Sequence, residues 1–480
     1  MGGLDLIVFI GYLLGTLYLS VIFFSKKRTS KSFILGSGKT PQWVVTLSIF
    51  ATFVSSISYL ALPGSAYESN WNAFVFSLSI PIAALITVKY FVPVYRKINS
   101  SSAYTFLEQR FGPWAKIYAS LCYIATQMMR VGTIIYLLAL AINMILDWDM
   151  VTVIVFTGVF VTAYTIIGGI EAVLWTDAIQ AIILILGAVF CVVILIIGIP
   201  GGAGHLIEVA AQDHKFSLGD FGGSIIEPTF WVVFVYGIFI NLQNFGIDQN
   251  YIQRYMVSSS DANAKKSALY GGLLYLPVSA IFLFIGTALY AYYKVNGGLP
   301  FSLSETPDKV FPHFIINELP NGISGLLIAS IFAAGMSSIS TSFNSTSTVL
   351  LTDYFKRDAT EKQKLTFLYI STLVICIISI SIALMMMDVK SILDAWWKYA
   401  SILSGGMLGL FLLGIFSKIN KRINAIIALF AGILMIIILT FYTILFPDQD
   451  PLAHPYLTTV IGTLAIFFTG ILMRYISAKN

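Results

Sequence analysis

Apolar stretches long enough to cross a bilayer as helices recur along almost the whole chain. A hydrocarbon core takes about 20 apolar residues as a helix, and thirteen such windows follow one another with short polar breaks. Only 11% of the 480 residues are charged and 58% are hydrophobic, whereas soluble domains carry roughly a quarter charged residues. The sequence therefore predicts an all-α polytopic membrane protein with 13 transmembrane helices. Their expected spans are 4–24, 43–62, 73–95, 114–146, 150–168, 172–199, 230–255, 268–293, 323–352, 366–387, 392–416, 423–446 and 455–475.

The continuity of these stretches separates them from two other sequence patterns. Strands of a membrane barrel would show about ten residues of alternating polarity, which these stretches lack. The first stretch has no basic leader, and it runs into Lys26, Lys27 and Arg28 without a small-residue cleavage site. It is predicted to stay as a helix and not to be removed as a signal peptide.

Basic residues are concentrated in alternate loops, which predicts the orientation. Loops rich in Lys and Arg stay cytoplasmic, so the N-terminus is expected outside the cytoplasm and the C-terminus inside it. The cytoplasmic side then holds Lys26, Lys27, Arg28, Lys31, Lys39, Arg96, Lys97, Arg110, Lys116, Arg254, Lys265, Lys266, Lys356, Arg357, Lys362, Lys364, Lys418, Lys421, Arg422, Arg474 and Lys479. The opposite side holds Lys215, Lys294, Lys309 and Lys390. Basic loops that face anionic lipid explain the net charge of +5 without nucleic acid, and short loops suit a bacterial inner membrane.

Serine and threonine gather in the middle of the second predicted span. Thr52, Ser55, Ser56 and Ser58 follow one another closely, and Pro63 comes after them. Hydroxyl side chains compete with the helix for backbone hydrogen bonds, so this run predicts an unwound stretch with free carbonyl groups. The alternative is that small residues let two helices pack closely.

A longer polar stripe runs along the ninth predicted span. At 100° per residue, five of its polar side chains share one face over about three turns, namely Ser337, Thr341, Asn344, Ser345 and Thr348. A hard cation such as Na⁺ takes several oxygen ligands. Packing would explain two or three hydroxyls, whereas a stripe of this length favours a pathway or a binding site.

Two charged residues fall inside predicted spans, where charges are costly and mark functional sites. Asp177 lies near the start of the sixth span, where either a bound cation or the helix macrodipole would stabilise it. Arg130 lies near the middle of the fourth span, at a cost of at least about 2.5 kcal/mol. Because a guanidinium binds a carboxylate bidentately, Arg130 predicts a carboxylate-bearing solute. The alternative is a structural ion pair with Asp177 or Asp248.

Weaker polar signals occur in the seventh and eleventh spans, where they line a pathway or lie near the membrane interfaces. They are Asn241, Gln243, Asn244, Asp248, Asp394, Lys398, Ser401 and Ser404. All four histidines fall in predicted external loops and all three cysteines in predicted helices, so neither a proton relay nor a disulfide or metal pattern is expected. No hydrolase or metalloprotease motif occurs, and the chain is not expected to be an enzyme.

Five segments resemble the sodium/solute symporter family, and together they cover most of the chain. The family's first two cytoplasmic loops are similar to KSFILGSGKTPQW (31–43) and SAYTFLEQRFG (102–112). Its most recognisable signatures are similar to GGIEAVLWTDAIQ (168–180), DQNYIQR (248–254) and FAAGMSSISTSFNSTSTVLLTD (332–353). The resemblance implies a LeuT-type fold, in which two inverted repeats of five helices place the site at the membrane midplane beside broken helices.

Under this resemblance the whole chain is a single transmembrane transporter domain. Its parts are a peripheral first helix and loop at 1–42, a first repeat at 43–199, an external loop at 200–229, a second repeat at 230–416 and two peripheral helices at 417–480.

The resemblance also implies two sodium sites. Carried over residue by residue, the first site uses the backbone carbonyls of Ala51, Val54 and Ala334 with the hydroxyls of Ser337 and Ser338. The second site, described in some members, uses Asp177 with Ser337, Ser340 and Thr341. Na⁺ is therefore the expected coupling ion.

Within the family, Arg130 and the residues after it resemble the sialic acid transporter branch, in which this arginine binds the substrate carboxylate. The expected substrate site consists of Arg130, Ser55, Ser58, Phe53, Ala73, Ser77, Asn241 and Asn244. Ser55 and Ser58 match the branch, whereas Phe53, Ala73 and Ser77 stand where a threonine, an aromatic residue and a glutamine are expected.

The expected function is Na⁺-driven import of a small organic anion, best matched by sialic acid (N-acetylneuraminate), with two Na⁺ per substrate. A charge moved through 100 mV supplies about 2.3 kcal/mol and a tenfold gradient about 1.4 kcal/mol. One Na⁺ would therefore accumulate a monoanion roughly tenfold, and two would accumulate it several-thousandfold. The alternatives are a Na⁺ symporter for proline, pantothenate, a monocarboxylate or a sugar and, more remotely, an ion channel. The expected partners are an anionic solute and the lipid bilayer, and a monomer suffices.

Overall fold

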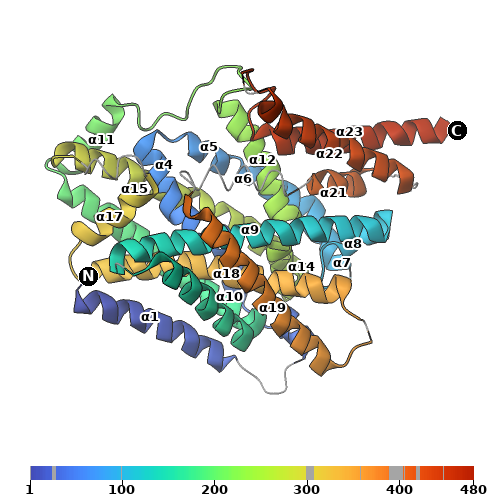
Figure 1. Cartoon of the computed structure of the whole chain (residues 1–480), viewed down its shortest axis with the longest axis horizontal. Coiled ribbons are helices and arrows are strands. Elements are labelled where there is room, and N and C mark those ends of the chain that lie inside the picture. Colours follow the sequence, from blue (N-terminus) through green and yellow to red (C-terminus); the bar gives the residue numbers. More distant parts are fainter. Residues whose placement is uncertain are drawn as a thin grey trace.

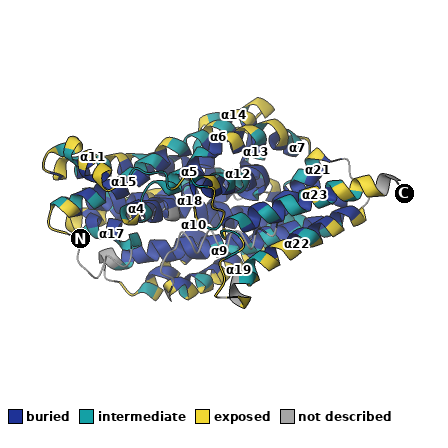
Figure 2. Cartoon of the chain, turned by 90° about the horizontal axis from the view of Figure 1, so that it is seen from above, coloured by how far each residue is buried: buried dark blue, intermediate teal, exposed yellow. Residues whose placement is uncertain are grey.

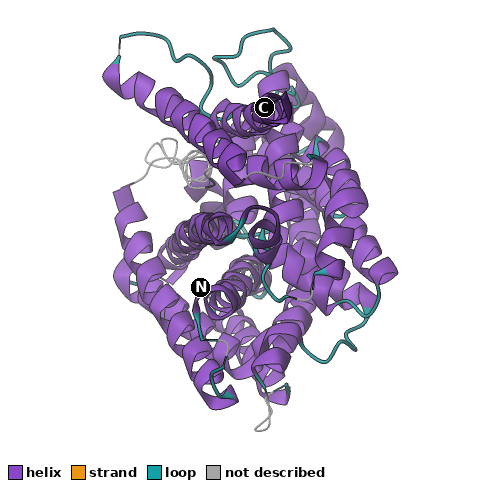
Figure 3. Cartoon of the chain, turned by 90° about the vertical axis from the view of Figure 1, so that its right-hand side faces the viewer, coloured by secondary structure: helices purple, strands orange, loops and turns teal. Residues whose placement is uncertain are grey.

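Helices make up all the regular structure that the computed structural model describes. It describes residues 2–23, 29–98, 100–146, 148–298, 307–356, 358–388, 404, 406–417, 422–446 and 448–479. Within these ranges there is no strand (Figure 3), so the all-α class is confirmed. The helices are α1 Gly3–Ile22, α2 Ser30–Leu35, α3 Gln42–Phe53, α4 Leu62–Glu68, α5 Asn72–Leu78, α6 Ile80–Ile86, α7 Val92–Lys97, α8 Thr105–Phe111, α9 Pro113–Leu146, α10 Met150–Gly198, α11 Gly202–Gln212, α12 Phe230–Ile247, α13 Gln249–Val257, α14 Asp261–Leu273, α15 Tyr275–Val295, α17 Val310–Asn317, α18 Ile323–Tyr354, α19 Glu361–Met385, α21 Met407–Phe416, α22 Arg422–Leu445 and α23 Leu457–Lys479. Two π-helical turns lie at Ile57–Ala61 and Thr87–Phe91, and two 3-10 turns at Pro307–Lys309 and Met386–Asp388.

Long apolar helices confirm the polytopic membrane class. Among the described residues, ten helices are long and apolar enough to cross a membrane, if the consecutive runs Asn72–Lys97 (α5 to α7) and Asp261–Val295 (α14 and α15) each count as one. The number is eleven if the bent pair α3 and α4 is one span. One of the ten, α10, has 49 residues, more than twice the length that a span needs. Gly169 interrupts it with φ 64° and ψ −165°, a conformation that glycine adopts at little cost. This interruption lies at the boundary expected between the spans 150–168 and 172–199.

The span expected at 392–416 falls mostly outside the described residues. Asp394, Lys398 and Ser401 are among those that the structure does not describe, and the end of this span is α21.

Two helices are broken at their centres with nearly the same backbone geometry. After α3 ends at Phe53, Val54 has φ −78° and ψ 121°, and the chain bends by 63° into α4. After α12 ends at Ile247, Asp248 has φ −78° and ψ 124°, and α13 begins. The hydroxyl-rich sequence predicted the first break. The second was missed, because one uninterrupted helix was expected over 230–255, and this expectation is wrong.

Local chemistry explains both breaks. Asp248 is the N-cap of α13, since its Oδ1 accepts the backbone N–H of Asn250 at 2.7 Å. Pro63 near the start of α4 lacks an N–H and does not fit the interior of a regular α-helix, and a wide π-helical turn over Ile57–Ala61 precedes it. Each break leaves backbone carbonyls at a helix end without regular helical partners.

The central helix of the molecule is α18, which packs against α9 and α10 (Figures 1 and 2) and also against α3. A carboxylate from α1 caps its first turn: Asp5 Oδ1 accepts the backbone N–H groups of Gly322 and Gly325 at 2.5 and 3.0 Å. At the C-terminal end of the chain, α22 and α23 lie side by side (Figure 1). The helix that carries the polar stripe is therefore enclosed by other helices.

Cations from separate segments of the chain line one cavity, called the basic cavity below. They are Lys31, Arg96, Lys116, Lys356 and Lys364, which line it together with Glu108, and all five were expected on one side of the membrane. These segments therefore lie at the same end of the molecule. Lys215 and Lys294, expected on the opposite side, both lie near the ring of Tyr290.

Candidate functional site

The first helix break and the polar stripe of α18 meet in the interior. Ser337 Oγ donates to the carbonyls of Ala51 and Ala334 at 3.2 and 3.0 Å. Ser338 Oγ donates to the carbonyl of Val54 at 3.2 Å. None of these residues is more than 2% exposed. The structure thus brings together the five oxygens expected at the first sodium site, called the five-oxygen cluster below.

The chemistry of this cluster fits a small cation. Carbonyl and hydroxyl oxygens are the ligands that hard cations take, and all five atoms are of these types. Because α3 ends at Phe53, the Ala51 and Val54 carbonyls lie at or beyond the last regular turn of the helix. The cluster also joins two elements, since its other three oxygens belong to α18, so a bound cation would hold the broken segment against the central helix.

The C-terminal part of the polar stripe, from Asn344 to Thr348, contacts α13 and does not face lipid. Gln253 Nε2 donates to Asn344 Oδ1 at 2.8 Å and to Thr348 Oγ1 at 3.4 Å. Ser345 Oγ donates to Gln253 Oε1 at 2.8 Å. All four residues are fully buried. The stripe is therefore a polar contact between α18 and the helix that follows the second break.

Asp177, on α10, lies in a second polar cluster next to the first. Its Oδ2 accepts Arg254 Nη2 at 2.7 Å and Ser48 Oγ at 2.6 Å, and Thr341 Oγ1 lies at 3.5 Å. Ser340 Oγ donates instead to a carbonyl of its own helix, that of Ser337, at 3.1 Å. Of the residues expected with Asp177, the structure brings Thr341 to the carboxylate, while Ser337 and Ser340 lie in the preceding turn.

Arg254 was expected on the cytoplasmic side, at the end of the span 230–255, and was not predicted as a site residue. Its side chain and that of Asp177 are both fully buried. The sequence offered only an indirect signal, because the two partners are 77 residues apart. That signal is the polarity of the DQNYIQR segment within an otherwise apolar region.

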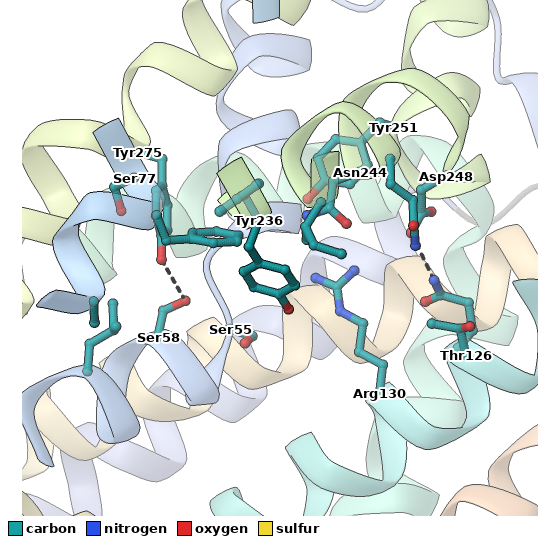
Figure 4. A pocket seen from close by; sticks show the side chains of 17 residues that line it. Ser55, Ser58, Ser77, Thr126, Arg130, Tyr236, Asn244, Asp248, Tyr251 and Tyr275 are labelled. Atoms are coloured by element: carbon teal, nitrogen blue, oxygen red, sulfur yellow. Dashed lines mark hydrogen bonds between the residues drawn. The ribbon is translucent and has the colours of Figure 1, made fainter. Parts of the chain in front are cut away.

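A pocket of about 100 Å³, called the central pocket below, lies beside the first break (Figure 4). Seven of the eight predicted substrate residues line the pocket, namely Phe53, Ser55, Ser58, Ala73, Ser77, Arg130 and Asn244. The eighth, Asn241, does not. Its Nδ2 donates to the carbonyl of Phe76 and to Ser79 Oγ, so it joins α12 to the C-terminal end of α5.

Sequence reasoning missed several polar residues of the central pocket, which are Thr126, Gln127, Tyr236, Tyr251 and Tyr275. Tyr275 OH lies 3.2 Å from Ser58 Oγ (Figure 4), and its ring packs against that of Phe53. The chain has 25 tyrosines, and nothing in their spacing distinguishes these three. Gln243 and Asp248, which gave only weak signals, also line the pocket.

Arg130 extends from α9 into the central pocket (Figure 4). Its Nη2 donates to the carbonyl of Thr52 at 2.7 Å. Within the described ranges Arg130 forms no ion pair with a carboxylate. Asp177 is held by Arg254, and Asp248 accepts Gln127 Nε2 at 3.0 Å. The structural ion pair that was the alternative for Arg130 is therefore not formed.

Thr52 connects the two parts of the site. It lies directly after Ala51 and two residues before Val54, whose carbonyls belong to the five-oxygen cluster. The guanidinium of Arg130 and the cluster therefore share one short segment of backbone. A cation bound on one side of this segment would help to fix the position of the arginine on the other side.

Comparisons with known proteins found one family and several relatives that match most of the chain. The sequence model of the sodium:solute symporter family matches residues 33–435. The sodium/sialic acid symporter SiaT of Proteus mirabilis is 34% identical over 91% of this chain and 89% of its own length. The sodium/sialic acid symporter NanT of Aliivibrio fischeri is 31% identical over 100% of this chain and 94% of its own length. A substrate-bound, outward-open structure of a Na⁺-coupled sialic acid symporter, which revealed a novel Na⁺ site, has a TM-score of 0.91 at 30% identity and covers 99% of this chain and 98% of that one.

Proposed function

Because this chain belongs to the sodium:solute symporter family, we propose that it carries a sialic acid across the membrane together with Na⁺. Membership makes the chain a Na⁺-coupled, multi-pass membrane transporter, and the family consists of transporters. The choice of sialic acid is supported by the two sialic acid symporters that it matches over most of its length.

The observation that carries this proposal is the environment of Arg130. Its guanidinium lines the central pocket, forms no ion pair in the described part of the chain, and interacts electrostatically with Asp248, which lines the same pocket. A buried cation that is not directly paired with a carboxylate favours an anionic ligand, and the planar guanidinium matches a carboxylate bidentately. Ser55, Ser58 and Asn244 would then bind hydroxyl and amide groups of the same ligand.

Sodium binding would organise this pocket. A Na⁺ in the five-oxygen cluster holds the broken segment of α3 against α18, and Thr52 in that segment is bonded to Arg130. A transporter that binds substrate more tightly with Na⁺ must also bind Na⁺ more tightly with substrate. Alternating access then requires that both ligands are released on the far side.

A second Na⁺ at Asp177 is the next part of the proposal. Asp177 Oδ1 is buried and has no hydrogen-bond partner among the described residues, so one carboxylate oxygen is available to a cation. With two Na⁺ and one monoanion, each cycle moves one net positive charge. That charge is worth about 2.3 kcal/mol per 100 mV.

The finer topology is also proposed. Thirteen spans, arranged as two inverted repeats of five helices with peripheral helices, are supported by the matched breaks after Val54 and Asp248 and by the interruption at Gly169. An extracytoplasmic N-terminus is supported by the gathering of cations around the basic cavity, because basic loops stay in the cytoplasm.

The test is uptake of labelled sialic acid into proteoliposomes that contain the purified protein. We expect saturable uptake that needs an inward Na⁺ gradient and is competed by unlabelled sialic acid. Current recordings on the same vesicles should give one net positive charge per substrate.

Three outcomes separate the parts of the proposal. Competition by proline, pantothenate or a monocarboxylate, with none by sialic acid, would replace the substrate and keep the symporter. Electroneutral uptake would exclude the second Na⁺. Uptake that does not saturate and is the same in K⁺ would exclude the symporter and favour a channel.

A further inference from the structure

The most densely bonded buried cation of the described chain is Arg254, and the proposed transport cycle gives it no role. It lies in α13, the helix that follows the second break, and its side chain is fully buried. It donates to four groups, which are Ser48 Oγ at 2.7 Å, the Asn250 carbonyl at 2.7 Å, Asp177 Oδ2 at 2.7 Å and Thr341 Oγ1 at 2.6 Å.

These contacts connect α13 to three other helices. Ser48 is on α3, one turn before Ala51, and Thr341 is on α18, one turn after Ser337. Asp177 is on α10. Arg254 therefore holds α13 against both helices that supply the five-oxygen cluster.

The two oxygens of Asp177 have different surroundings. Oδ2 accepts hydrogen bonds from Arg254 and Ser48, whereas Oδ1 is buried without a partner in the described residues. A buried acceptor without a partner is unfavourable, and the arginine already neutralises the charge of the carboxylate. A cation or a hydrogen-bond donor at Oδ1 would therefore remove this cost.

The helix α13 separates two cavities. Asp248 and Tyr251, at its start, line the central pocket, and Met256, near its end, lines the basic cavity. Between them the helix is buried and bonded through polar side chains: Asn250 Nδ2 donates to Gln127 Oε1 at 2.9 Å, and Gln253 binds the polar stripe of α18. A solute leaving the central pocket for the basic cavity must pass this helix.

We infer that Arg254 is a positioning residue that couples the second sodium site to α13, because it holds one oxygen of Asp177 and leaves the other for Na⁺. A Na⁺ on Oδ1 fixes the carboxylate with Oδ2 toward Arg254, and α13 stays closed between the two cavities. Without Na⁺ the carboxylate gains by turning Oδ1 toward a donor, which weakens its contact with Arg254 and loosens α13. This inference rests on the proposed function, since it assigns a role to the second sodium site.

The test is hydrogen–deuterium exchange of the backbone amides of α13, measured by mass spectrometry on the full chain in Na⁺ and in K⁺. We expect Na⁺ to slow this exchange in the wild type by about 5- to 150-fold, the usual range of coupling between two sites. In Arg254→Lys the charge beside Asp177 remains, but one ammonium group cannot bind four separated acceptors as the guanidinium does. Na⁺ should still bind, as followed by tryptophan fluorescence, while its effect on α13 is lost.

Arg96→Lys is the matched control. Arg96 Nη1 donates to the carbonyls of Tyr255, Met256 and Ser258 and so holds the other end of α13, with an ion pair to Asp261 instead of Asp177. This change should speed exchange at the end of α13 equally in both salts and leave the Na⁺ effect intact. If Arg254→Lys does not fold, the double variant Asp177→Asn with Arg254→Gln, which removes both buried charges, should lack the Na⁺ effect.

A Na⁺ effect on α13 that survives in Arg254→Lys or in the double variant would overturn the inference. So would a wild type that shows Na⁺-driven uptake but no Na⁺ effect on α13. A wild type without any Na⁺-driven uptake would instead overturn the proposed function, and the two failures are thereby distinguished.

Discussion

Replacing Arg130 by alanine should remove most of the affinity for the anionic substrate and leave Na⁺ binding in place. The guanidinium donates to the Thr52 carbonyl and contacts Tyr251, and it forms no ion pair in the described chain. Its remaining donors are therefore available to a carboxylate. Two charge-assisted hydrogen bonds at about 1.5–3 kcal/mol each give about 3–6 kcal/mol, which corresponds to roughly two to four orders of magnitude in Kd.

Arg130→Lys refines this prediction. A lysine keeps the charge but loses the planar fork, so it should lose only one of the two bonds, roughly one to two orders of magnitude in Kd. The ranking wild type, lysine, alanine separates a bidentate contact from a general effect of positive charge in the pocket.

Isothermal titration of sialic acid in saturating Na⁺ measures these affinities, and tryptophan fluorescence follows Na⁺ binding in the same samples. Arg110→Ala is the matched control, because Arg110 also donates to backbone carbonyls, those of Gly414 and Ser417, but lies outside the central pocket. Substrate affinity within about threefold of wild type in Arg130→Ala would refute the assigned role. A loss of equal size in Arg110→Ala would show that the effect comes from general destabilisation.

Three further predictions concern the ions and the outer surface. Ser337→Ala removes an oxygen of the five-oxygen cluster, and it should weaken Na⁺ binding about ten- to 150-fold in fluorescence titrations if the contact equals a hydrogen bond to a charged group. The double variant Asp177→Asn with Arg254→Gln should transport electroneutrally, and its accumulation ratio should fall from several-thousandfold to roughly tenfold in vesicle uptake. Hydrogen bonds from Lys294 and Tyr290 hold the pKa of Asp213 below its usual value. Because the fold favours the charged form, their contribution is complete above the unfolded pKa of about 4 and is lost as the pH falls through the lower folded pKa, so Asp213→Asn should lower the unfolding temperature more at pH 7 than in acid below pH about 4.

The sequence predicted the features that depend on neighbouring residues. The hydroxyl run before Pro63 predicted the break of α3, since such side chains compete for the backbone locally. The spacing of Ser337, Thr341 and Asn344 predicted one polar face on α18. A charge at the middle of a span marked Arg130 as functional, and it does line the central pocket.

Features that depend on partners far apart in the chain were not predictable in this way. Arg254 was placed on the cytoplasmic side by the positive-inside rule, which uses sequence position alone, and its ion pair with Asp177 on another helix was not predicted. The break at Asp248 was missed because the sequence alone does not distinguish an aspartate that caps a helix from a polar residue that lines a pathway. Asn241 is a polar residue of the kind that lines binding pockets, but its position on α12 directs its side chain to the Phe76 carbonyl and Ser79 Oγ, to which it donates hydrogen bonds.

The contact of Asp5 with the first turn of α18 has a practical consequence for expression and labelling. Asp5 of α1 supplies the acceptor for a helix that begins more than 300 residues later in the chain, so this contact can form only after the whole stretch between them has been translated. The backbone N–H of Gly2 is bound to the same carboxylate at 2.8 Å. An affinity tag or fluorescent fusion is therefore better attached behind α23 than in front of Gly2.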